Sequence, residues 1–184
     1  AKVMGREFAF TNGSIVSLED AKAKLNQFKT DKLVVIDKKG RIRGLITGRD
    51  IAELEKNPLA NKDAKGQLRV GAAIGATGDY LERATALIED RVDVIVMDVA
   101  HAHNLAVVKP AVENFQKKFG EFELVCGNIA TYQAAEFMQD LGVSGVKVGI
   151  GSGYGCWTRI KTSFGVSQVQ ALRAVFKATA LPII

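Results

Sequence analysis

A glycine-rich segment that ends in a cysteine has the composition of a reactive loop. The stretch GIGSGYGCWTR, residues 149–159, places four glycines, a serine and a tyrosine ahead of Cys156. A thiolate is a strong nucleophile, and glycines allow a backbone to approach a ligand closely. The pattern therefore indicates nucleophilic chemistry at Cys156, with an ordinary loop thiol as the alternative. The second cysteine, Cys126, lies within an apolar run and is expected in the core.

Two other polar segments each follow an apolar run. The segment MDVAHAHN contains Asp98 and two histidines, His101 and His103, and the segment CGNIAT contains Asn128. The carboxyl ends of parallel strands meet at one edge of a sheet, and ligands bind at that edge. Asp98 and Asn128 are therefore candidates for ligand contacts, although Asp98 could instead cap a turn. We interpret His101 and His103 as structural rather than catalytic residues.

Strand and helix patterns alternate from residue 69 to the end of the chain. Strands are predicted for the apolar runs LRVGAAIG, VDVIVMDVA, FELVCGN, GVKVGIG and LPII. Helices are predicted for GDYLERATALIED, KPAVENFQKKFG, TYQAAEFMQDLG and VSQVQALRAVFKAT, with Thr131 as a cap and Gly120 and Gly142 at two helix ends. Continuous apolar strands are typical of a parallel sheet covered on both faces. The fold class is therefore α/β, either a doubly wound sheet or part of a (β/α)8 TIM barrel.

The first third of the chain has a different pattern. Ser17 and Asp20 form a helix start, and four apolar residues recur at helical spacing: Leu18, Ala21, Leu25 and Phe28. KLVVID and RIRGLIT are predicted strands joined by a turn at Gly40, and a short helix is expected to begin at Asp50. The predicted domains are residues 1–56, a polar linker over 57–68, and the βα-repeat domain over 69–184.

Composition limits the classes of function. Hydrophobic residues make up 47% of the chain and charged residues 24%, as in a globular domain. The net charge is +5, with cations spread along the chain, so we expect a solvated surface and no nucleic-acid binding. No apolar stretch reaches the roughly 18 residues of a membrane helix, so no membrane partner is expected. Two cysteines do not form a disulfide framework, which favours a cytoplasmic location.

Three segments together resemble the IMP dehydrogenase and GMP reductase family. GVKVGIGSGYGCWTR resembles the family's catalytic loop, G-[VL]-K-[VI]-G-I-G-x-G-S-x-C-x-T-R. VDVIVMDVAHAHN and VCGNIAT resemble its D-V-I-V-[IL]-D-x-A-H-G-H-S and A-G-N-[VI]-[AV]-T segments, in the same order and at similar spacing. KLVVIDKKGRIRGLITGRDI resembles the end of the second CBS module found in the family. The resemblance implies part of a TIM barrel, preceded by the end of a CBS module over residues 1–56.

The resemblance also implies an activity and its ligands. It implies NAD-dependent oxidation of IMP to XMP through a thioimidate on a cysteine, in guanine nucleotide biosynthesis. It further implies a purine nucleotide substrate, a potassium ion, a homotetramer, and adenine nucleotide at the CBS module. By position, the matching residues are these: catalytic Cys156 and Thr158; cofactor-binding Asp98, Gly149, Ile150 and Gly151; substrate-binding Asn128 and Tyr154; potassium-binding carbonyls of Gly151, Gly153 and Cys156.

The sequence departs from the family pattern at several positions of the loop. Tyr154 replaces the serine that contacts the substrate phosphate, Gly155 replaces a branched apolar residue, and Trp157 replaces a small or apolar one. Ser167 stands in place of a downstream proline. Segments of the family that follow LPII are not in this sequence, so we expect an internal part of such an enzyme. GMP reductase is the alternative activity, and a non-catalytic nucleotide sensor with CBS modules is a further one.

Overall fold

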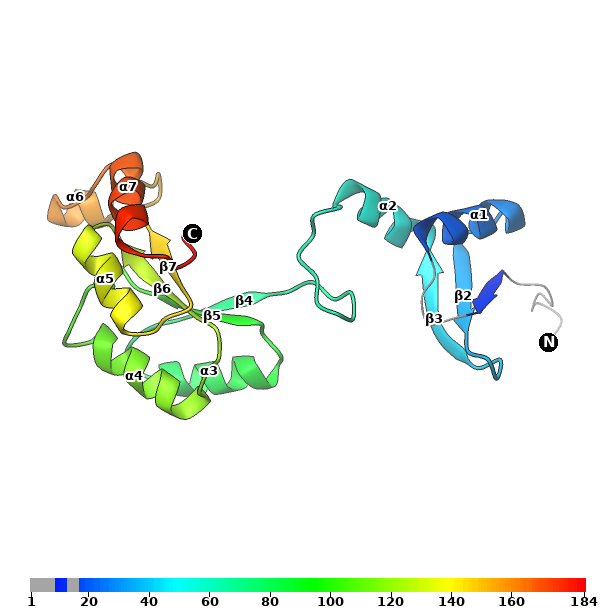
Figure 1. Cartoon of the computed structure of the whole chain (residues 1–184), viewed down its shortest axis with the longest axis horizontal. Coiled ribbons are helices and arrows are strands. Elements are labelled where there is room, and N and C mark those ends of the chain that lie inside the picture. The colour runs from blue at the N-terminus through cyan, green and yellow to red at the C-terminus, as the bar shows by residue number, and fades with distance from the viewer. Residues whose placement is uncertain (1–8, 13–16) are drawn as a thin grey trace. The chain divides into compact units, whose positions relative to one another are not determined.

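The computed structural model describes residues 9–12 and 17–184, which form two compact units. The first unit is Ala1–Leu68 and the second is Arg69–Ile184 (Figure 1). The two units are described separately below.

The first unit is a three-stranded sheet with two helices. Its elements are β1 (Phe10–Asn12), α1 (Leu18–Phe28), β2 (Lys32–Ile36), β3 (Ile42–Thr47) and α2 (Gly48–Lys56). The strand order is β1-β2-β3, with β1 parallel to β2 and β3 antiparallel to β2. Both helices contact the sheet and each other (Figure 1). Their small core is made of Ala9, Ala21, Leu25, Leu33 and Ile51.

Local signals explain most boundaries of this unit. The Ser17 hydroxyl accepts a hydrogen bond from the Asp20 backbone N–H at 3.1 Å, which confirms the predicted start of α1. Gly40 turns the β2–β3 hairpin at a φ of 74°. The prediction that α2 begins at Asp50 was wrong. Thr47 is the N-cap. Asp50 is the third residue of the helix and completes a capping box, in which its carboxylate accepts from the Thr47 backbone N–H at 2.8 Å.

The second unit is a parallel sheet in which every strand is followed by one or two helices. Its elements are β4 (Gly71–Ile74), α3 (Tyr80–Glu89), β5 (Val94–Asp98), α4 (Val108–Phe119), β6 (Leu124–Ile129), α5 (Tyr132–Asp140), β7 (Gly145–Val148), α6 (Thr158–Thr162) and α7 (Gln168–Ala178). The strand order is β4-β5-β6-β7, and every neighbouring pair is parallel. Past α7 the chain returns to the sheet, where Ile183 bridges Val146 in parallel. The predicted α/β repeat with a parallel sheet is thus confirmed, and its sequential strand order is consistent with part of a (β/α)8 barrel.

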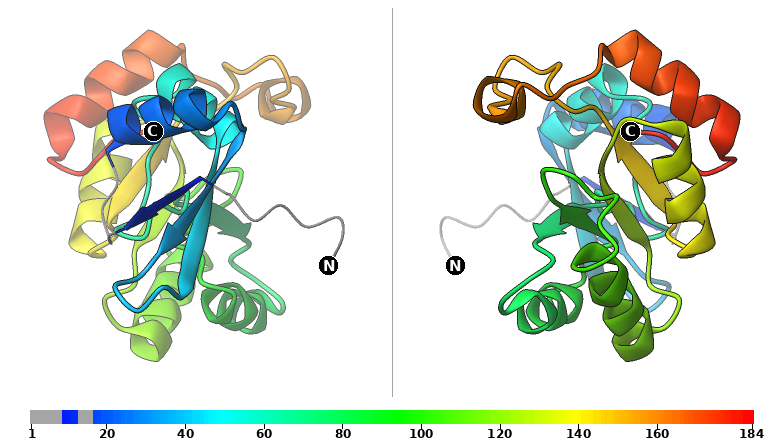
Figure 2. Two further views of the ribbon diagram at one scale, coloured as in Figure 1. Left: turned by 90° about the vertical axis from the view of Figure 1, so that its right-hand side faces the viewer. Right: turned by 90° about the vertical axis from the view of Figure 1, so that its left-hand side faces the viewer.

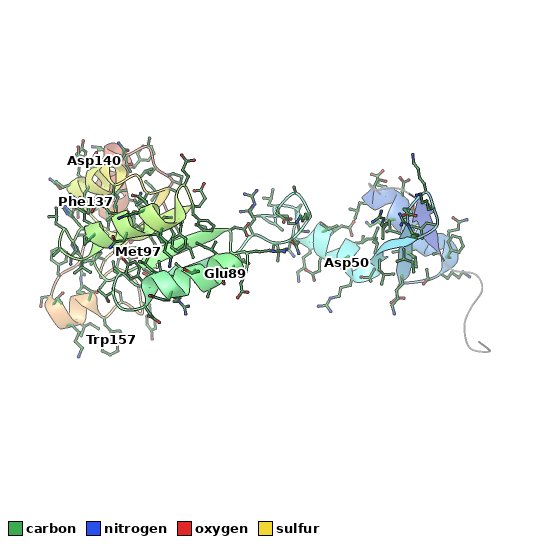
Figure 3. All side chains as sticks on the ribbon, turned by 90° about the horizontal axis from the view of Figure 1, so that it is seen from below. Asp50, Glu89, Met97, Phe137, Asp140 and Trp157 are labelled. Carbon is green, nitrogen blue, oxygen red and sulfur yellow. The ribbon has the colours of Figure 1, made fainter. Side chains whose placement is uncertain are left out.

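Helices cover one face of this sheet. The helices α3, α4, α5 and α7 lie in an arc along that face, whereas the short helix α6 stands apart from it (Figure 2). Side chains on that face are fully buried, for example Met97, Cys126 and Val146, which are aligned by the strand register. Met97 accordingly lies inside the unit, whereas Trp157 projects from it (Figure 3). This burial confirms the prediction that Cys126 belongs to the core.

The expectation of two covered faces is met by β6, where consecutive residues facing opposite sides are buried, but not by β5. On the other face of β5, Val94 and Val96 are half-buried and Asp98 is exposed. In a closed barrel that face is filled by side chains from strands on the opposite side. The sequence also did not predict the short helix α6, because its five residues show no apolar periodicity.

Candidate functional site

The carboxyl ends of β5, β6 and β7 bring three predicted segments to one edge. Asp98 is the last residue of β5, Asn128 lies near the end of β6, and the cysteine loop begins directly after β7. The backbone N–H of Gly149 donates to the carbonyl of Ile129 at 2.9 Å, which ties the start of the loop to β6. The structure therefore brings together Asp98, Asn128 and the loop, as parallel strand order requires.

Asp98 forms an ion pair that the sequence analysis did not anticipate. The Lys147 ammonium lies 2.6 Å from the Asp98 carboxylate, although β6 separates their two strands. The register explains the contact, because Asp98 pairs with Gly127 and Gly127 pairs with Lys147. Gly127 has no side chain to block the space between them. A Cβ there would lie 2.5 Å from the Lys147 carbonyl oxygen and 2.6 Å from its Cβ.

Asn128 presents a buried acceptor at the same edge. Two backbone hydrogen bonds hold it in place. Its N–H donates to the Val99 carbonyl at 2.8 Å, and its carbonyl accepts from the Ala102 N–H at 2.9 Å. Its Oδ1 atom is buried and has no hydrogen-bond partner within the described part of the chain. A buried polar atom without a partner is costly, and a ligand donor would relieve that cost.

The base of the cysteine loop is tightly packed. Gly149 and Gly151 have positive φ values of 140° and 77°, which favour glycine. A Cβ on Gly151 would lie 2.9 Å from the Cα of Gly165, so two backbones pass at close range. Between them Ile150 is buried, and its carbonyl accepts from the Val166 N–H at 3.0 Å.

Cys156 lies at the end of the loop in a setting that favours its thiolate. Hydrogen bonds from the side chain and backbone N–H of Thr158, and from the backbone N–H of Gly151, lower the pKa of the Cys156 thiol. The Gly151 nitrogen is 3.3 Å from the Cys156 Sγ atom. Burial raises the pKa of Cys126 to about 12. The pKa values of the two thiols are therefore shifted in opposite directions, which favours the thiolate form at Cys156 and the neutral thiol at Cys126.

The tip of the loop is open. Tyr154 is fully exposed, and Trp157 is 65% exposed with the Lys161 ammonium 5.8 Å from the centre of its ring. No heavy atom of the described chain lies within 4 Å of a Cβ built on Gly155, outside its chain neighbours. The substitution of tyrosine for serine is thus accommodated because its side chain extends into solvent.

The histidines after Asp98 have aromatic neighbours. The rings of His103 and Phe137 are 4.9 Å apart, and those of His101 and Phe164 are 6.1 Å apart. His103 is half-buried and His101 is exposed. Ring packing of this kind is what a structural role produces.

Two residues of the site were missed at the sequence level, Lys147 and Gln168. The Gln168 side chain donates from Nε2 to the Val148 carbonyl at 2.9 Å and accepts from the Ser152 hydroxyl at 2.7 Å. Lys147 could have been found from its place inside the otherwise apolar run GVKV. A charged residue within a buried strand signals a partner. Gln168 carries no comparable signal, because a glutamine at the first turn of a helix is ordinary.

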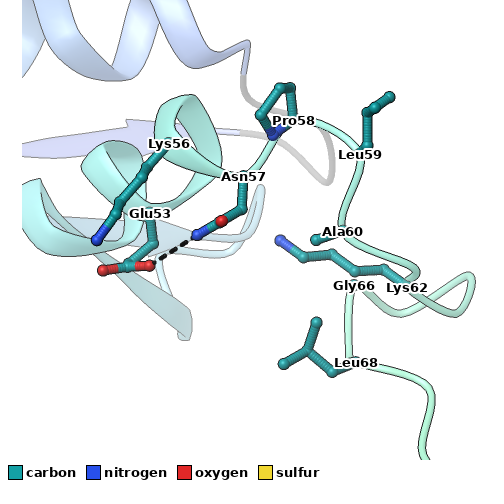
Figure 4. Close-up of a pocket in the computed structure, with 9 residues that line it drawn as sticks. All are labelled: Glu53, Lys56, Asn57, Pro58, Leu59, Ala60, Lys62, Gly66 and Leu68. Carbon is teal, nitrogen blue, oxygen red and sulfur yellow. Dashed lines mark hydrogen bonds between the residues drawn. The ribbon is translucent and has the colours of Figure 1, made fainter. Parts of the chain in front are cut away.

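Other features of the chain do not contribute to this edge. A groove in the first unit runs along the end of α2 and the chain that follows it, where Asn57 donates to Glu53 at 3.1 Å (Figure 4). Its walls include Leu59 and Leu68, which are strongly exposed. Among residues 9–12 and 17–184, no helix is long and apolar enough to cross a membrane. The same residues contain no cluster of histidine, cysteine and carboxylate side chains that could hold a metal ion.

The fold and the edge together define a βα-repeat domain with a cysteine of lowered pKa on a glycine-rich loop. A sequence model of the IMP dehydrogenase / GMP reductase domain matches residues 15–182. The chain therefore belongs to the IMP dehydrogenase / GMP reductase family, as its motifs predicted.

Individual relatives agree with this assignment. The chain is 46% identical over 157 residues to the inosine-5'-monophosphate dehydrogenase of Nitrosopumilus maritimus, which covers 85% of this chain and 33% of the relative. It is 39% identical over 187 residues to that of Aquifex aeolicus, covering 100% of this chain and 38% of the relative. The chain thus spans about a third of the length of these curated relatives.

Solved structures show the same fold. A GMP reductase from Trypanosoma brucei in complex with guanosine 5'-triphosphate superposes with a TM-score of 0.73 at 32% identity, covering 93% of this chain and 41% of that one. A cysteine-to-alanine variant of a GMP reductase from the same organism, in complex with guanosine 5'-monophosphate, superposes with a TM-score of 0.73 at 31% identity over 93% of this chain and 36% of that one.

Proposed function

We propose that the full-length protein is an IMP dehydrogenase that oxidises IMP to XMP with NAD, in guanine nucleotide biosynthesis. The observation that carries the proposal is the thiol of Cys156, which has a lowered pKa and stands on a loop at the carboxyl edge of the sheet. The names of the curated relatives support the same activity.

The proposed reaction uses Cys156 as a nucleophile. Its thiolate attacks C2 of the purine, so that an S–C2 bond forms, the C2–H bond breaks and a hydride departs. Water then attacks C2 of the thioimidate, the S–C2 bond breaks, a proton is released, and XMP leaves. Thr158 hydrogen bonds to the thiol, and its proposed role is to help transfer the proton of the attacking water.

The residues at the edge fit a nicotinamide nucleotide beside the substrate. NAD, when bound, supplies the acceptor for the hydride. The exposed carboxylate of Asp98 suits the hydroxyls of the nicotinamide ribose, and Lys147 holds that carboxylate in place. The backbone of Gly149, Ile150 and Gly151 would line the cofactor side. The unpartnered Oδ1 of Asn128 would accept a hydrogen bond from the bound substrate.

The loop also fits a monovalent cation. Carbonyl oxygens coordinate potassium, and the proposed set is Gly151, Gly153 and Cys156. The Gly153 carbonyl accepts from the Cys156 N–H at 3.0 Å, which closes the turn that holds two of these carbonyls. A carbonyl has two lone pairs, so this bond leaves one for a cation. The ion would stabilise the course of the loop around the thiol.

The proposal is tested by incubating full-length protein with IMP and NAD and following NADH absorbance. Turnover that Cys156→Ala abolishes supports it. Absence of turnover with correctly folded protein, with potassium present, contradicts it.

GMP reductase is the second candidate, because GMP reductases are among the solved structures with similar folds. That reaction reduces the purine and expels ammonia. The same protein incubated with GMP and NADPH distinguishes the two, since oxidation of NADPH with release of ammonia indicates the reductase. A non-catalytic nucleotide sensor would bind nucleotides and show neither reaction.

The remaining assignments concern the whole protein. We infer that residues 1–56 are the end of a CBS module, residues 57–68 a linker and residues 69–184 part of the catalytic barrel. The β1-α1-β2-β3-α2 order of the first unit supports a CBS module, and adenine nucleotide is its proposed ligand. A cytoplasmic homotetramer is the proposed form. Analytical ultracentrifugation tests the homotetramer, and calorimetric titration with ATP tests adenine nucleotide binding at the CBS module.

A further inference from the structure

We propose that Gln168 is a positioning residue that fixes the base of the cysteine loop, Gly149 to Ser152, while the loop tip, Gly153 to Cys156, moves. The inference rests on the proposed function, because it assigns the loop a catalytic thiol.

The first support is the way Gln168 bridges strand and loop. Its amide nitrogen donates to the carbonyl of Val148, the last residue of β7, and its amide oxygen accepts from the Ser152 hydroxyl. The two bonds measure 2.9 and 2.7 Å and use both ends of one amide. The side chain therefore fixes the distance between the end of the strand and the fourth residue of the loop.

The second support is steric. A Cβ on Gly149 would lie 2.7 Å from the Gln168 Oε1 atom, so Gln168 is packed directly on the first loop residue. The segment before α7 continues this contact, because Gly165 packs against Gly151 and Val166 donates to the Ile150 carbonyl. The loop base is held along its length by one stretch of chain, and Gln168 is its polar anchor.

The contrast with the loop tip completes the argument. A Cβ on Gly153 would meet the Cys156 Cβ at 3.8 Å, an ordinary contact, and one on Gly155 would meet no atom of the described chain within 4 Å, chain neighbours aside. Tyr154 is fully exposed. The loop tip can therefore move the thiol towards the purine ring of the substrate and away again. The fixed loop base returns the thiol to the same position each time. A displacement of about 1 Å at a reacting atom can cost about a hundredfold in rate.

The chain offers a matched control for a test in the full-length protein. Gln170 is on the same helix, two residues from Gln168, and is exposed. We would compare Gln168→Leu with Gln170→Leu, and add Ser152→Ala, which removes one partner of Gln168 from an exposed position. The measurements are kcat, KM for the nucleotide, the melting temperature, and hydrogen exchange of the peptide that covers residues 149–156.

The expected result is a loss in kcat with little change in KM. Gln168→Leu should lower kcat about ten- to a hundredfold, with KM within about twofold, and Ser152→Ala should lower kcat by a smaller factor. The double variant should be no slower than Gln168→Leu alone, because both changes remove the same bond. Hydrogen exchange of the loop should accelerate in both variants and stay unchanged in Gln170→Leu.

Three outcomes would overturn the inference: unchanged kcat in Gln168→Leu, unchanged loop exchange, or an equal loss in Gln170→Leu. If Gln168→Leu lowers the melting temperature strongly, Ser152→Ala decides the matter by its kcat and exchange. If the wild-type protein neither oxidises IMP nor reduces GMP, the proposed function is contradicted instead. The exchange comparison would still show whether Gln168 holds the loop.

Discussion

Selective alkylation of Cys156 is the most direct test of the proposed nucleophile. The perturbation is iodoacetamide added to folded full-length protein near pH 7. Burial raises the pKa of Cys126 to about 12, so that only about 10⁻⁵ of this thiol is ionised at that pH. An ordinary thiol is a few per cent ionised, and the pKa of Cys156 is lowered by its hydrogen bonds from Thr158 and Gly151. Cys156 should therefore react at least about a thousand times faster than Cys126.

The pH dependence has a definite sign. Because the thiolate is the reacting species, the rate at Cys156 rises with pH and levels off at a lower pH than for a free cysteine. Cys126 should stay unmodified at every pH at which the protein remains folded. The assay is time-resolved mass spectrometry of the two cysteine peptides, and in denaturant both should react at similar rates. Comparable rates in the folded protein, or preference for Cys126, would refute the reasoning.

Three substitutions and one control substitution test the other contacts of the site. Lys147→Met should raise KM for NAD about tenfold, because it releases Asp98. It should change the free energy of unfolding by less than about 1 kcal/mol, because the ion pair is partly exposed. An unchanged KM for NAD would contradict this role of Lys147. Gly127→Ala should destabilise the protein by about 1–3 kcal/mol in thermal melts, since its methyl group would lie 2.5 Å from the Lys147 carbonyl oxygen. Gly155→Ala, at an open position, is its control and should melt normally. Tyr154→Ser should tighten IMP binding about ten- to a hundredfold by restoring a hydrogen bond to the substrate phosphate. Unchanged or weaker IMP affinity in a titration would show that the tyrosine already binds the phosphate.

Local patterns were sufficient for the elements that position the site. Thr131 caps α5 through its hydroxyl, which accepts from the Ala134 N–H at 3.2 Å, as its place before the helix predicted. Gly120 and Gly142 end their helices with positive φ, as predicted. These features depend on neighbours a few residues away, so sequence proximity specifies them. The start of α2 was mispredicted because Asp50 resembles a cap, while the residue that caps the helix is Thr47.

The sequence by itself determined the family, the order of βα units and the three segments that meet at the sheet edge. Parallel strands force their carboxyl ends together, so the meeting of Asp98, Asn128 and the loop needed no coordinates. Tertiary structure alone decided the partners of those residues. Lys147 reaches Asp98 across 49 positions of sequence, because the register aligns both with a glycine. Gln168 reaches the loop because the chain returns past it after α6. Such contacts depend on register and on the path of the backbone, which local residue patterns do not encode.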